Sequence, residues 1–398
     1  MRVLMTADTC GGVWTQAVEL CRGLSERGHA VALATSGGLP TDDQRAAVAA
    51  LPRVALRPTN FKLEWMPDAA AEVRAFGETL LRLCEATAPD VVHLNEFSHG
   101  ALDFRAGGRR VPTLVVGHSD VLSWHAAVRG SDAGPEWDGY RRAVRAGLAG
   151  ADLVAAPTAW MLDELKARFG PFAASTVLTN GLGAAPEVRT SEAPADADRE
   201  PFVFSAGRYW DEGKNVAALG AVAERLDWPV RLAGLPAPDG EATPPAGVRF
   251  LGRLSSDEIA AQYAIAGLYC LPAKYEPFGL TPLEAARGGC PLVLGDCASL
   301  REVWGDAAAF VPPDDREALA RTLNRLIRDP AARRDLAARA ARRAARLTRT
   351  AMTDAYLAAY RTLTDGPSDG TEPLRPPRAV GRTVNQAPAP SREPAGVA

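Results

Sequence analysis

The chain has 398 residues, long enough for two domains that each bury a substantial core. Hydrophobic residues make up 47% and charged residues 23%, and the net charge of −3 gives no reason to expect a nucleic-acid partner. The six cysteines form no Cys-x-x-Cys pair, and no signal sequence or apolar stretch of about 18 residues appears, so we expect a cytoplasmic protein without disulfides or membrane spans.

The first half of the chain alternates between strand-like and helix-like segments, which predicts βα units and parallel sheets. Apolar runs predict strands at about 2–7, 30–35, 91–94, 112–117, 152–156 and 175–179. Helical periodicity falls at about 13–27, 68–87, 136–149 and 158–169. We therefore predict one Rossmann-like, doubly wound domain over residues 1–183.

Two loops of this half are candidate ligand positions. Gly11 and Gly12 follow the first strand and precede a helix, where paired glycines let a ligand approach the backbone amides. His118 follows another strand, at a carboxyl end where sites form in open α/β sheets. Each has a structural alternative, because Gly-Gly is also an ordinary turn and a lone histidine is usually a satisfied structural group.

Residues 184–200 break the pattern and are predicted to be an interdomain linker, because Ala, Pro, Glu and Asp dominate there and periodicity vanishes. A second βα series begins at Phe202. Its predicted strands lie near 229–233, 248–251, 267–271, 291–294 and 308–311. We predict a second Rossmann-like domain over 201–349, with a cleft between the domains where a ligand binds.

Two cations open the second domain. Arg208 ends its first strand, and Lys214 is predicted in the first turn of the following helix. A cation there opposes the helix dipole, and an anion between the amides and the lysine offsets that cost. A planar guanidinium and a compact ammonium at neighbouring edges of one crevice suit a diphosphate. The alternative is a solvated surface pair.

Residues 272–291 are the most informative segment. A buried strand ends just before it, Glu276 follows, and a turn leads into a helix that carries Glu284. The backbone amides of Gly279 and Leu280 would point outward at the helix N-terminus, where an anion is favoured. One carboxylate would then hold sugar hydroxyls, and the other would hold hydroxyls beyond the phosphate.

Glu284 also has a structural alternative. The residues Thr281-Pro282-Leu283-Glu284 form a good capping box with proline at the first helical position. In that interpretation Glu284 only caps the helix N-terminus. The spacing of the residues alone does not distinguish this capping role from a ligand-binding role.

The chain is predicted to be helical from 314 to 364. In the final helix, predicted over 350–364, Met352, Tyr356 and Tyr360 share one face, which favours packing.

Two further segments are defined by composition. The arginine-rich stretch 321–349 is interpreted as a solvated helical face, with docking on anionic lipid headgroups of the inner membrane surface as the alternative. Residues 365–398 have hardly an apolar side chain and are predicted to be a disordered tail.

The string Glu-Pro-Phe-Gly-Leu at 276–280, with a second glutamate at position 284, closely resembles the signature of glycosyltransferase family 4. The segment from Arg208 to Lys214 resembles the phosphate clamp of that family, with one residue more between the two cations than in its commonest form. Members are retaining, sugar-nucleotide-dependent enzymes of the GT-B architecture, in which two Rossmann-like domains face each other across a cleft.

The resemblance implies roles for the second-domain residues. Arg208, Lys214 and the amides around Gly279 would stabilise the charge that develops on the leaving diphosphate. Glu276 would orient the donor sugar, and Glu284 would bind the ribose diol. The predicted catalytic residues are Glu276, Arg208, Lys214 and His118, and the predicted donor-binding residues are Gly11, Gly12, Phe278, Gly279, Leu280 and Glu284.

The resemblance also implies roles in the first domain. His118 would contact the donor sugar or its phosphate when the domains close, and His93, at another strand end, would be structural. Trp124 and His125 could line an acceptor pocket. The last helix, 350–364, would cross back onto the first domain.

The sequence therefore predicts a retaining glycosyltransferase that moves a hexose-type sugar from a nucleotide-diphosphate sugar to a hydroxyl acceptor, which is a glycan, a lipid or a small molecule. Because Arg208 and Lys214 would neutralise the diphosphate, we expect neither a metal nor a cofactor. The alternatives are a sugar-nucleotide epimerase on a similar scaffold and a non-catalytic sugar-nucleotide-binding protein. The sugar, base, acceptor, pathway and oligomeric state do not follow from the sequence.

Overall fold

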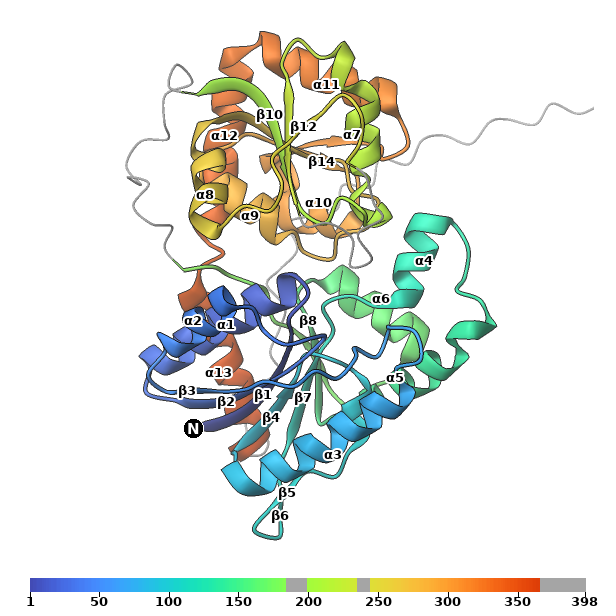
Figure 1. The fold of residues 1–398 in the computed structure, drawn as a ribbon, viewed down its shortest axis with the longest axis vertical. Coiled ribbons are helices and arrows are strands. Elements are labelled where there is room, and N and C mark those ends of the chain that lie inside the picture. The colour runs from blue at the N-terminus through green and yellow to red at the C-terminus, as the bar shows by residue number, and fades with distance from the viewer. Residues whose placement is uncertain (184–198, 235–243, 366–398) are drawn as a thin grey trace, which may run out of the picture.

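The computed structural model describes residues 1–183, 199–234 and 244–365. They form two α/β domains, each built on a parallel sheet and stacked end to end (Figure 1). The predicted fold class, two Rossmann-like doubly wound domains, is confirmed. The predicted tail beyond Asp365 and the predicted linker, apart from Arg199 and Glu200, lie outside the described residues.

The first domain contains a seven-stranded parallel sheet in the order β3-β2-β1-β4-β7-β8-β9. Its strands are β1 (Arg2–Asp8), β2 (Ala30–Ser36), β3 (Val54–Arg57), β4 (Val91–Leu94), β7 (Thr113–Val116), β8 (Leu153–Ala156) and β9 (Ser175–Val177). The central strands β4 and β7 are buried at every residue, because hydrophobic clusters cover both faces of the sheet. The six predicted strands are present, whereas the sequence does not predict the short edge strand β3.

Helices and short turns surround this sheet. They are α1 (Gly12–Glu26), α2 (Asp42–Ala49), α3 (Ala70–Thr87), η1 (Ser98–Ala101), α4 (Val121–Arg129), η2 (Pro135–Trp137), α5 (Asp138–Gly150) and α6 (Ala159–Phe169), and a small hairpin joins β5 (Arg105–Ala106) to β6 (Arg109–Arg110). The sequence does not predict α2 or α4. Helix α4 begins where the Asp120 carboxylate accepts the N–H groups of Leu122 and Ser123.

The second domain contains a six-stranded parallel sheet in the order β12-β11-β10-β13-β14-β15. Its strands are β10 (Glu200–Ala206), β11 (Val230–Ala233), β12 (Arg249–Phe250), β13 (Ala266–Leu271), β14 (Leu292–Gly295) and β15 (Ala309–Val311). Between them lie η4 (Glu212–Lys214), α7 (Val216–Val222), η5 (Ala223–Arg225), α8 (Ser256–Ile265), α9 (Leu280–Arg287), α10 (Ala298–Trp304) and η6 (Gly305–Ala307).

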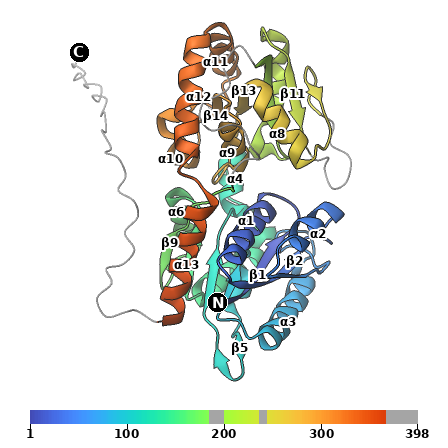
Figure 2. The same ribbon diagram turned by 90° about the vertical axis from the view of Figure 1, so that its left-hand side faces the viewer.

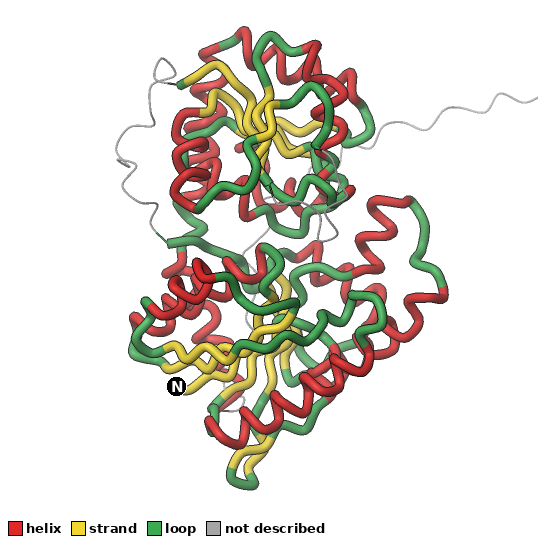
Figure 3. The backbone as a smooth tube through the Cα atoms, in the orientation of Figure 1, coloured by secondary structure: helices red, strands yellow, loops and turns green. Residues whose placement is uncertain are grey.

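The strand order places the first loop of each domain at a comparable point. Strand β1 lies between β2 and β4, and β10 lies between β11 and β13, so the chain reverses its direction of winding beside each. In open α/β sheets, ligands bind at the carboxyl ends of the strands at this switch point. The loops after β1 and β10 carry Gly11, Gly12 and Arg208, and Figure 3 shows loops gathered between the two sheets.

Three helices end the described chain: α11 (Arg316–Arg328), α12 (Pro330–Ala344) and α13 (Arg349–Asp365). Helices α11 and α12 cover the second sheet, and α13 lies against the first domain (Figure 2). Met352, Tyr356 and Tyr360 of α13 are buried in the same hydrophobic cluster as β1 and α1. The shared face predicted from the sequence is therefore a packing face.

The chain crosses between the domains twice, and the two crossings pair with each other. Leu182 forms a parallel bridge with Thr348, and the Leu182 carbonyl accepts the Arg349 N–H at 2.6 Å. Arg287 of α9 donates to the carbonyls of Leu182, at 2.9 Å, and Gly183. Helix α9 is thus attached directly to both crossings.

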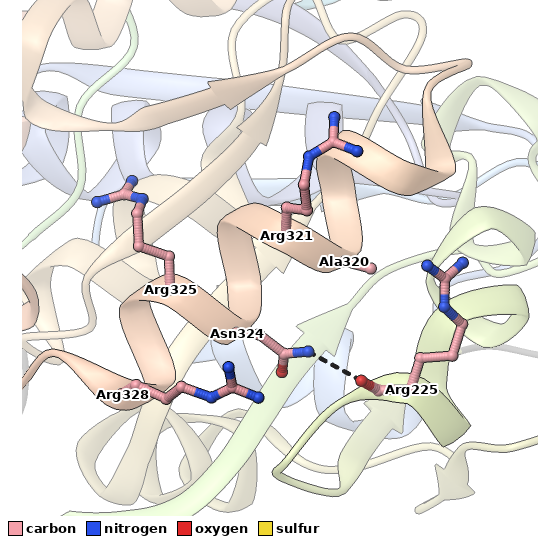
Figure 4. Close-up of a pocket in the computed structure, with 6 residues that line it drawn as sticks. All are labelled: Arg225, Ala320, Arg321, Asn324, Arg325 and Arg328. Carbon is pink, nitrogen blue, oxygen red and sulfur yellow. Dashed lines mark hydrogen bonds between the residues drawn. The ribbon is translucent and has the colours of Figure 1, made fainter.

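The arginine-rich helices expose most of their guanidinium groups. Arg333 is an exception, since it is buried, stacks on Trp228 and donates to the carbonyl of Leu326. A shallow cavity of about 290 Å³ on α11 is lined by Arg225, Ala320, Arg321, Asn324, Arg325 and Arg328 (Figure 4). Among the described residues, none of the helices is both long and apolar enough to cross a membrane. The membrane contact stays a prediction.

Candidate active site

The two predicted cations lie in the loop between β10 and α7. Arg208 follows β10 by two residues, and Lys214 is the last residue of the 3₁₀ turn η4. The prediction that Lys214 belongs to the first turn of the next helix is wrong. Asn215, in the left-handed region with φ of 53°, separates η4 from α7, and its side chain donates to the Pro272 carbonyl at 2.9 Å. Lys214 therefore lies in a turn that is hydrogen-bonded, through Asn215, to the loop that carries Glu276.

Lys214 and Glu276 form an ion pair. Lys214 Nζ lies 2.6 Å from Glu276 Oε2, and the two side chains are only 17% and 13% exposed. The other carboxylate oxygen, Oε1, accepts the Gly279 N–H at 2.9 Å. The amide of Gly279, expected to face a bound anion, therefore has a partner within the chain, and Glu276 connects the lysine to the N-terminus of α9.

Helix α9 does not begin with the capping box that the sequence allows. It starts at Leu280, after Gly279 in the left-handed region with φ of 91°, so Thr281 lies within the helix. The Thr281 hydroxyl accepts a hydrogen bond from Tyr269 Oη at 2.8 Å. The capping alternative is thus wrong, because Glu284 is free of any role at the helix N-terminus.

Glu284 lies one turn into α9. Its Oε2 accepts a hydrogen bond from Tyr263 Oη at 3.2 Å, and the structure gives Oε1 no hydrogen-bond partner among the described residues. Burial raises the pKa of Glu284 to about 7. A carboxyl that titrates near neutrality with one unoccupied oxygen is suited to accept hydroxyl groups of a ligand.

The glycine pair of the first domain meets the second domain at the same place. A Cβ atom on Gly11 would lie 3.1 Å from Arg208 Nη1, and one on Gly12 would lie 3.4 Å from Leu280 Cδ1. The structure therefore brings Gly11, Gly12, Arg208 and Leu280 together. Phe278 contributes only its backbone, because its side chain is buried in the core of the second domain.

Two acidic residues here do not follow from the sequence analysis. Asp8 ends β1, accepts the Cys10 N–H at 3.0 Å and has a pKa raised by burial, partly offset by the charge of Arg208. Asp211 forms an ion pair with Arg208, with Nη2 and Oδ2 at 3.0 Å. Both lie within three residues of a predicted ligand position, but nothing in their spacing distinguishes them from solvated loop carboxylates.

His118 lies at the end of β7 in a chain of hydrogen bonds. Its Nε2 is 2.7 Å from Asn95 Oδ1, which also contacts Nε2 of His93 at 3.2 Å. Because the Asn95 amide nitrogen donates to the Thr6 carbonyl, Oδ1 is an acceptor and His118 Nε2 carries the proton. Burial lowers the pKa of His118 to about 4, so the ring is neutral at pH 7.

The remaining lone pair of His118, on Nδ1, has no hydrogen-bond partner among the described residues and can accept a hydroxyl proton. His93, by contrast, is fully buried, and its Nδ1 lies 2.7 Å from Tyr360 Oη of α13. This contact agrees with the structural role predicted for His93.

The residues predicted for an acceptor pocket are involved in other contacts. Trp124 Nε1 donates to Asp211 Oδ1 of the second domain at 3.2 Å. His125 packs edge-on against Trp124 and Trp137, with ring centroids 5.3 and 5.9 Å apart. The predicted acceptor role remains a prediction.

Among the residues that the structure describes, no group of three His, Cys, Asp or Glu side chains is placed to hold a metal ion. The chain contains an Asp-x-Asp sequence at 196–198, which lies outside those residues. Independence from metal therefore stays a prediction based on the two cations.

Comparison with known proteins places this geometry in a family. The profile of "Glycosyltransferase Family 4" matches residues 10–183, and that of "Glycosyl transferases group 1" matches residues 190–343. Glycogen synthase of Mycobacterium tuberculosis is 32% identical over 225 residues, which are 51% of this chain and 53% of that protein. O-antigen chain mannosyltransferase B of Escherichia coli is 32% identical over 116 residues, 29% of this chain and 30% of that protein. The chain thus spans about half or less of the length of these relatives.

Solved structures show the same fold. Sucrose-phosphate synthase from Thermosynechococcus elongatus superposes with a TM-score of 0.73 at 19% identity, over 92% of this chain and 99% of that chain. Anabaena HepE in complex with UDP-glucose superposes with a TM-score of 0.70 at 16% identity, over 91% of this chain and 100% of that chain. The two facing Rossmann-like domains are the GT-B architecture. With both family profiles matched in order along the chain, this protein belongs to glycosyltransferase family 4, the group 1 glycosyl transferases.

Proposed function

We propose that the protein is a retaining glycosyltransferase that transfers a hexose-type sugar from a nucleotide-diphosphate sugar to a hydroxyl acceptor. The observation that carries the proposal is the grouping of Lys214 and Glu276 at the N-terminus of α9, with Gly11 of the first domain against Arg208 and Gly12 against Leu280. Two cations beside a helix N-terminus suit a diphosphate, and a carboxylate next to them suits sugar hydroxyls.

Different residues would bind the diphosphate, the sugar and the ribose of the donor. Arg208 and Lys214 would stabilise the negative charge that develops on the leaving diphosphate as the glycosidic bond breaks. Glu276 would exchange its contact with Lys214 for hydroxyls of the sugar, which fixes the orientation of the ring. Glu284, with its unoccupied Oε1, would accept the ribose diol.

The first domain would complete the site. The neutral His118 would accept a hydrogen bond through Nδ1 from the donor sugar, and the backbone at Gly11 and Gly12 would approach the phosphates. The acceptor hydroxyl would attack from the first-domain side, its proton passing to the departing phosphate oxygen. The incoming bond would form on the face that the diphosphate leaves, which retains the anomeric configuration.

The activities named for several relatives agree with this proposal. The relatives include a glycogen synthase and mannosyltransferases, and HepE is described in complexes with UDP and with UDP-glucose. For this chain we propose a nucleoside diphosphate sugar as the donor. It would bind without a metal, because Arg208 and Lys214 supply the charge that a divalent cation would otherwise provide.

The experiment is a panel of UDP-, GDP- and ADP-sugars, each incubated with the purified protein, with and without glycan, lipid and small-molecule hydroxyl acceptors. We expect release of one nucleoside diphosphate that depends on an acceptor, the same anomeric configuration in the product as in the donor, and turnover that persists in EDTA. The anomeric configuration is measured by proton NMR.

Other results would select an alternative. Conversion of the sugar nucleotide to free sugar and nucleotide without any acceptor favours the epimerase. Binding of a sugar nucleotide without turnover in the presence of every acceptor favours a non-catalytic binding protein. Inversion at the anomeric carbon, or loss of activity in EDTA, contradicts the retaining or the metal-independent part of the proposal.

A further inference from the structure

Asp211 occupies the centre of the loop that carries both cations. Its Oδ2 accepts from Arg208 Nη2 at 3.0 Å, and its Oδ1 accepts from the Gly213 N–H at 2.9 Å and from Trp124 Nε1 at 3.2 Å. The side chain is only 11% exposed. Burial alone would raise the pKa of Asp211, but the charges of Lys214 and Arg208 hold it below its ordinary value. The carboxylate is therefore ionised and fully engaged.

Trp124 comes from the other domain, and the loop is shaped to receive it. A Cβ atom on Gly213 would lie 2.9 Å from Trp124 Nε1 and 3.0 Å from Asp211 Oδ1. Glycine at this position thus allows the indole to reach the carboxylate. The Gly213 carbonyl also accepts the N–H groups of Lys274 and Tyr275, at 2.8 and 3.1 Å, which fixes this turn against the loop that carries Glu276.

The first turn of α4 holds that second loop. Ser123 Oγ lies 2.8 Å from Tyr275 Oη, and the Asp120 N–H donates to the same oxygen at 3.3 Å. Tyr275 is buried and immediately precedes Glu276. One helix of the first domain therefore contacts both loops of the second domain that carry the candidate diphosphate-binding and sugar-binding groups.

We propose that Asp211 is a positioning residue that couples the guanidinium of Arg208 to helix α4 through Trp124. The carboxylate orients the guanidinium on one side and is itself held by the indole N–H on the other. Arg208 then takes the orientation that binds the leaving phosphate when α4 rests on η4, which requires the two domains to be closed. The inference rests on the proposed function. It adds a chain of contacts between the domains through which domain closure fixes the orientation of the Arg208 guanidinium.

The geometry predicts where in the reaction the coupling acts. Arg208 contributes most when charge develops on the diphosphate, so loss of its orientation lowers kcat more than it weakens binding of the donor. Because Asp211 and Trp124 act in series on one guanidinium, their substitutions are expected to be non-additive. Two side chains that merely stabilised the interface would instead give independent effects.

The kinetic test compares Asp211→Asn, Trp124→Phe and the double variant with the wild-type protein, using the donor and acceptor that the panel identifies. We expect Asp211→Asn to lower kcat by about 10- to 100-fold, with the KM of the donor changed less than about 3-fold. Trp124→Phe, which removes the N–H donor together with part of the ring system, is expected to lower kcat by about 5-fold in the wild-type background and less than about 2-fold beside Asp211→Asn.

The matched control is Glu212→Gln. Glu212 belongs to the same turn as Gly213 and pairs with Arg129 of α4 at 2.8 Å, and the two side chains are about half exposed, at 55% and 51%. The variant removes this pair but keeps Arg129, whose guanidinium lies 5.7 Å from the centroid of the Trp124 ring. This variant is expected to retain wild-type kcat, because exposed ion pairs contribute little. A fall in kcat as large as that of Trp124→Phe would show that any damage to this contact has the same effect, which overturns the specific role of Asp211.

A spectroscopic readout tests the connection without turnover. The protein labelled with 5-fluorotryptophan has a fluorine resonance from Trp124, which is assigned by its loss in Trp124→Phe. UDP, GDP and ADP are added in turn. We expect one of these nucleoside diphosphates to bind and to shift this resonance in the wild-type protein. In Asp211→Asn the same nucleoside diphosphate, added until the protein is saturated, is expected to leave the resonance unshifted.

The outcomes separate this inference from the proposed function. Absence of turnover by the wild-type protein with every donor and acceptor contradicts the proposed function. Suppose that the wild-type protein turns over. The positioning role is then contradicted if the effects of the two substitutions on kcat simply multiply in the double variant, or if Asp211→Asn raises only the KM of the donor. Thermal melting of each variant identifies any that fails to fold. If Asp211→Asn does not fold, the kcat of Trp124→Phe measured against the control variant and the fluorine shift of the wild-type protein carry the decision, and the absence of both effects contradicts the positioning role.

Discussion

At the scale of single residues, the site is neutralised internally before any donor is bound. Each proposed phosphate-binding cation has a carboxylate partner, Asp211 for Arg208 and Glu276 for Lys214, at 3.0 and 2.6 Å. A donor must therefore displace Glu276 from Lys214, whereas Asp211 occupies only Nη2 of Arg208 and leaves the other N–H groups of the guanidinium for a phosphate.

Glu276→Ala is predicted to reduce transfer by at least about 100-fold, because it removes the group that orients the sugar and leaves Lys214 and the Gly279 amide unpaired. Steady-state kinetics with the identified donor measure the change. Glu317→Ala is the control, since Glu317 forms an exposed pair with Arg225 on the same domain and is expected to leave activity unchanged. Wild-type turnover in Glu276→Ala would refute the role of this residue.

Glu284 is predicted to make donor binding depend on pH. The pKa of about 7 means that the carboxyl of the free protein carries a proton below neutrality, and binding of the ribose diol to the carboxylate must then release it. The KM of the donor is predicted to rise by up to about tenfold for each pH unit below 7 and to level off above it. Kinetics from pH 5.5 to 8.5 measure the profile. Glu284→Gln is expected to be flat, and an equally steep profile in that variant would assign the titration to another group.

At the scale of elements, the sequence predicts the sheets better than the loops of the site. Continuous apolar runs such as 266–271 can only be buried strands here, and they are. The start of α9 differs from prediction because the left-handed Gly279 is the N-cap, two residues before the predicted cap at Thr281, and the helix begins at Leu280. Lys214 lies in a 3₁₀ turn because Asn215 adopts a left-handed conformation that local propensity does not reveal.

The side-chain contacts between the facing loops of the two domains could not be predicted from the sequence. Asp211, Trp124 and Tyr275 are close only because two separate sheets present their loops to each other, and neither their spacing nor their periodicity carries that information. The residue types at the donor site followed from motif resemblance, whereas the partners of those residues required the three-dimensional structure.

The contact between α1 and α13 depends on a glycine. A Cβ atom on Gly23 would lie 2.0 Å from Thr353 Oγ1, so Gly23→Ala is predicted to lower the free energy of unfolding by about 1–3 kcal/mol through overpacking. Gly139→Ala is the matched control, because that helical glycine of α5 has open space around it and the change is expected to be neutral or slightly stabilising. Urea denaturation measures both. Equal stability of the two variants would contradict the close packing.

At the scale of the whole molecule, the two crossings and α9 form one unit. Arg287 donates to three backbone carbonyls of the crossings, those of Leu182, Gly183 and Leu347. Because α9 also carries Glu284 and begins directly after Gly279, the donor site is connected to the segment about which the domains would move.

Arg287→Met is predicted to lower the free energy of unfolding by about 1–3 kcal/mol, because it leaves partly buried carbonyls without donors. It should also increase the radius of gyration measured by small-angle X-ray scattering, as the crossings loosen. Arg301→Met is the control: Arg301 pairs with Asp296 at the surface of the same domain and touches neither crossing. An unchanged radius of gyration and unchanged stability in Arg287→Met would contradict the proposed unit.

The proposed donor site is tested most directly by a crystal structure of the protein with the nucleoside diphosphate that it releases in the donor panel. We expect the two phosphates between the guanidinium of Arg208, the ammonium of Lys214 and the first turn of α9, with Glu284 on the ribose. A diphosphate bound elsewhere, or one that leaves Arg208 and Lys214 paired only with their carboxylates, would contradict it.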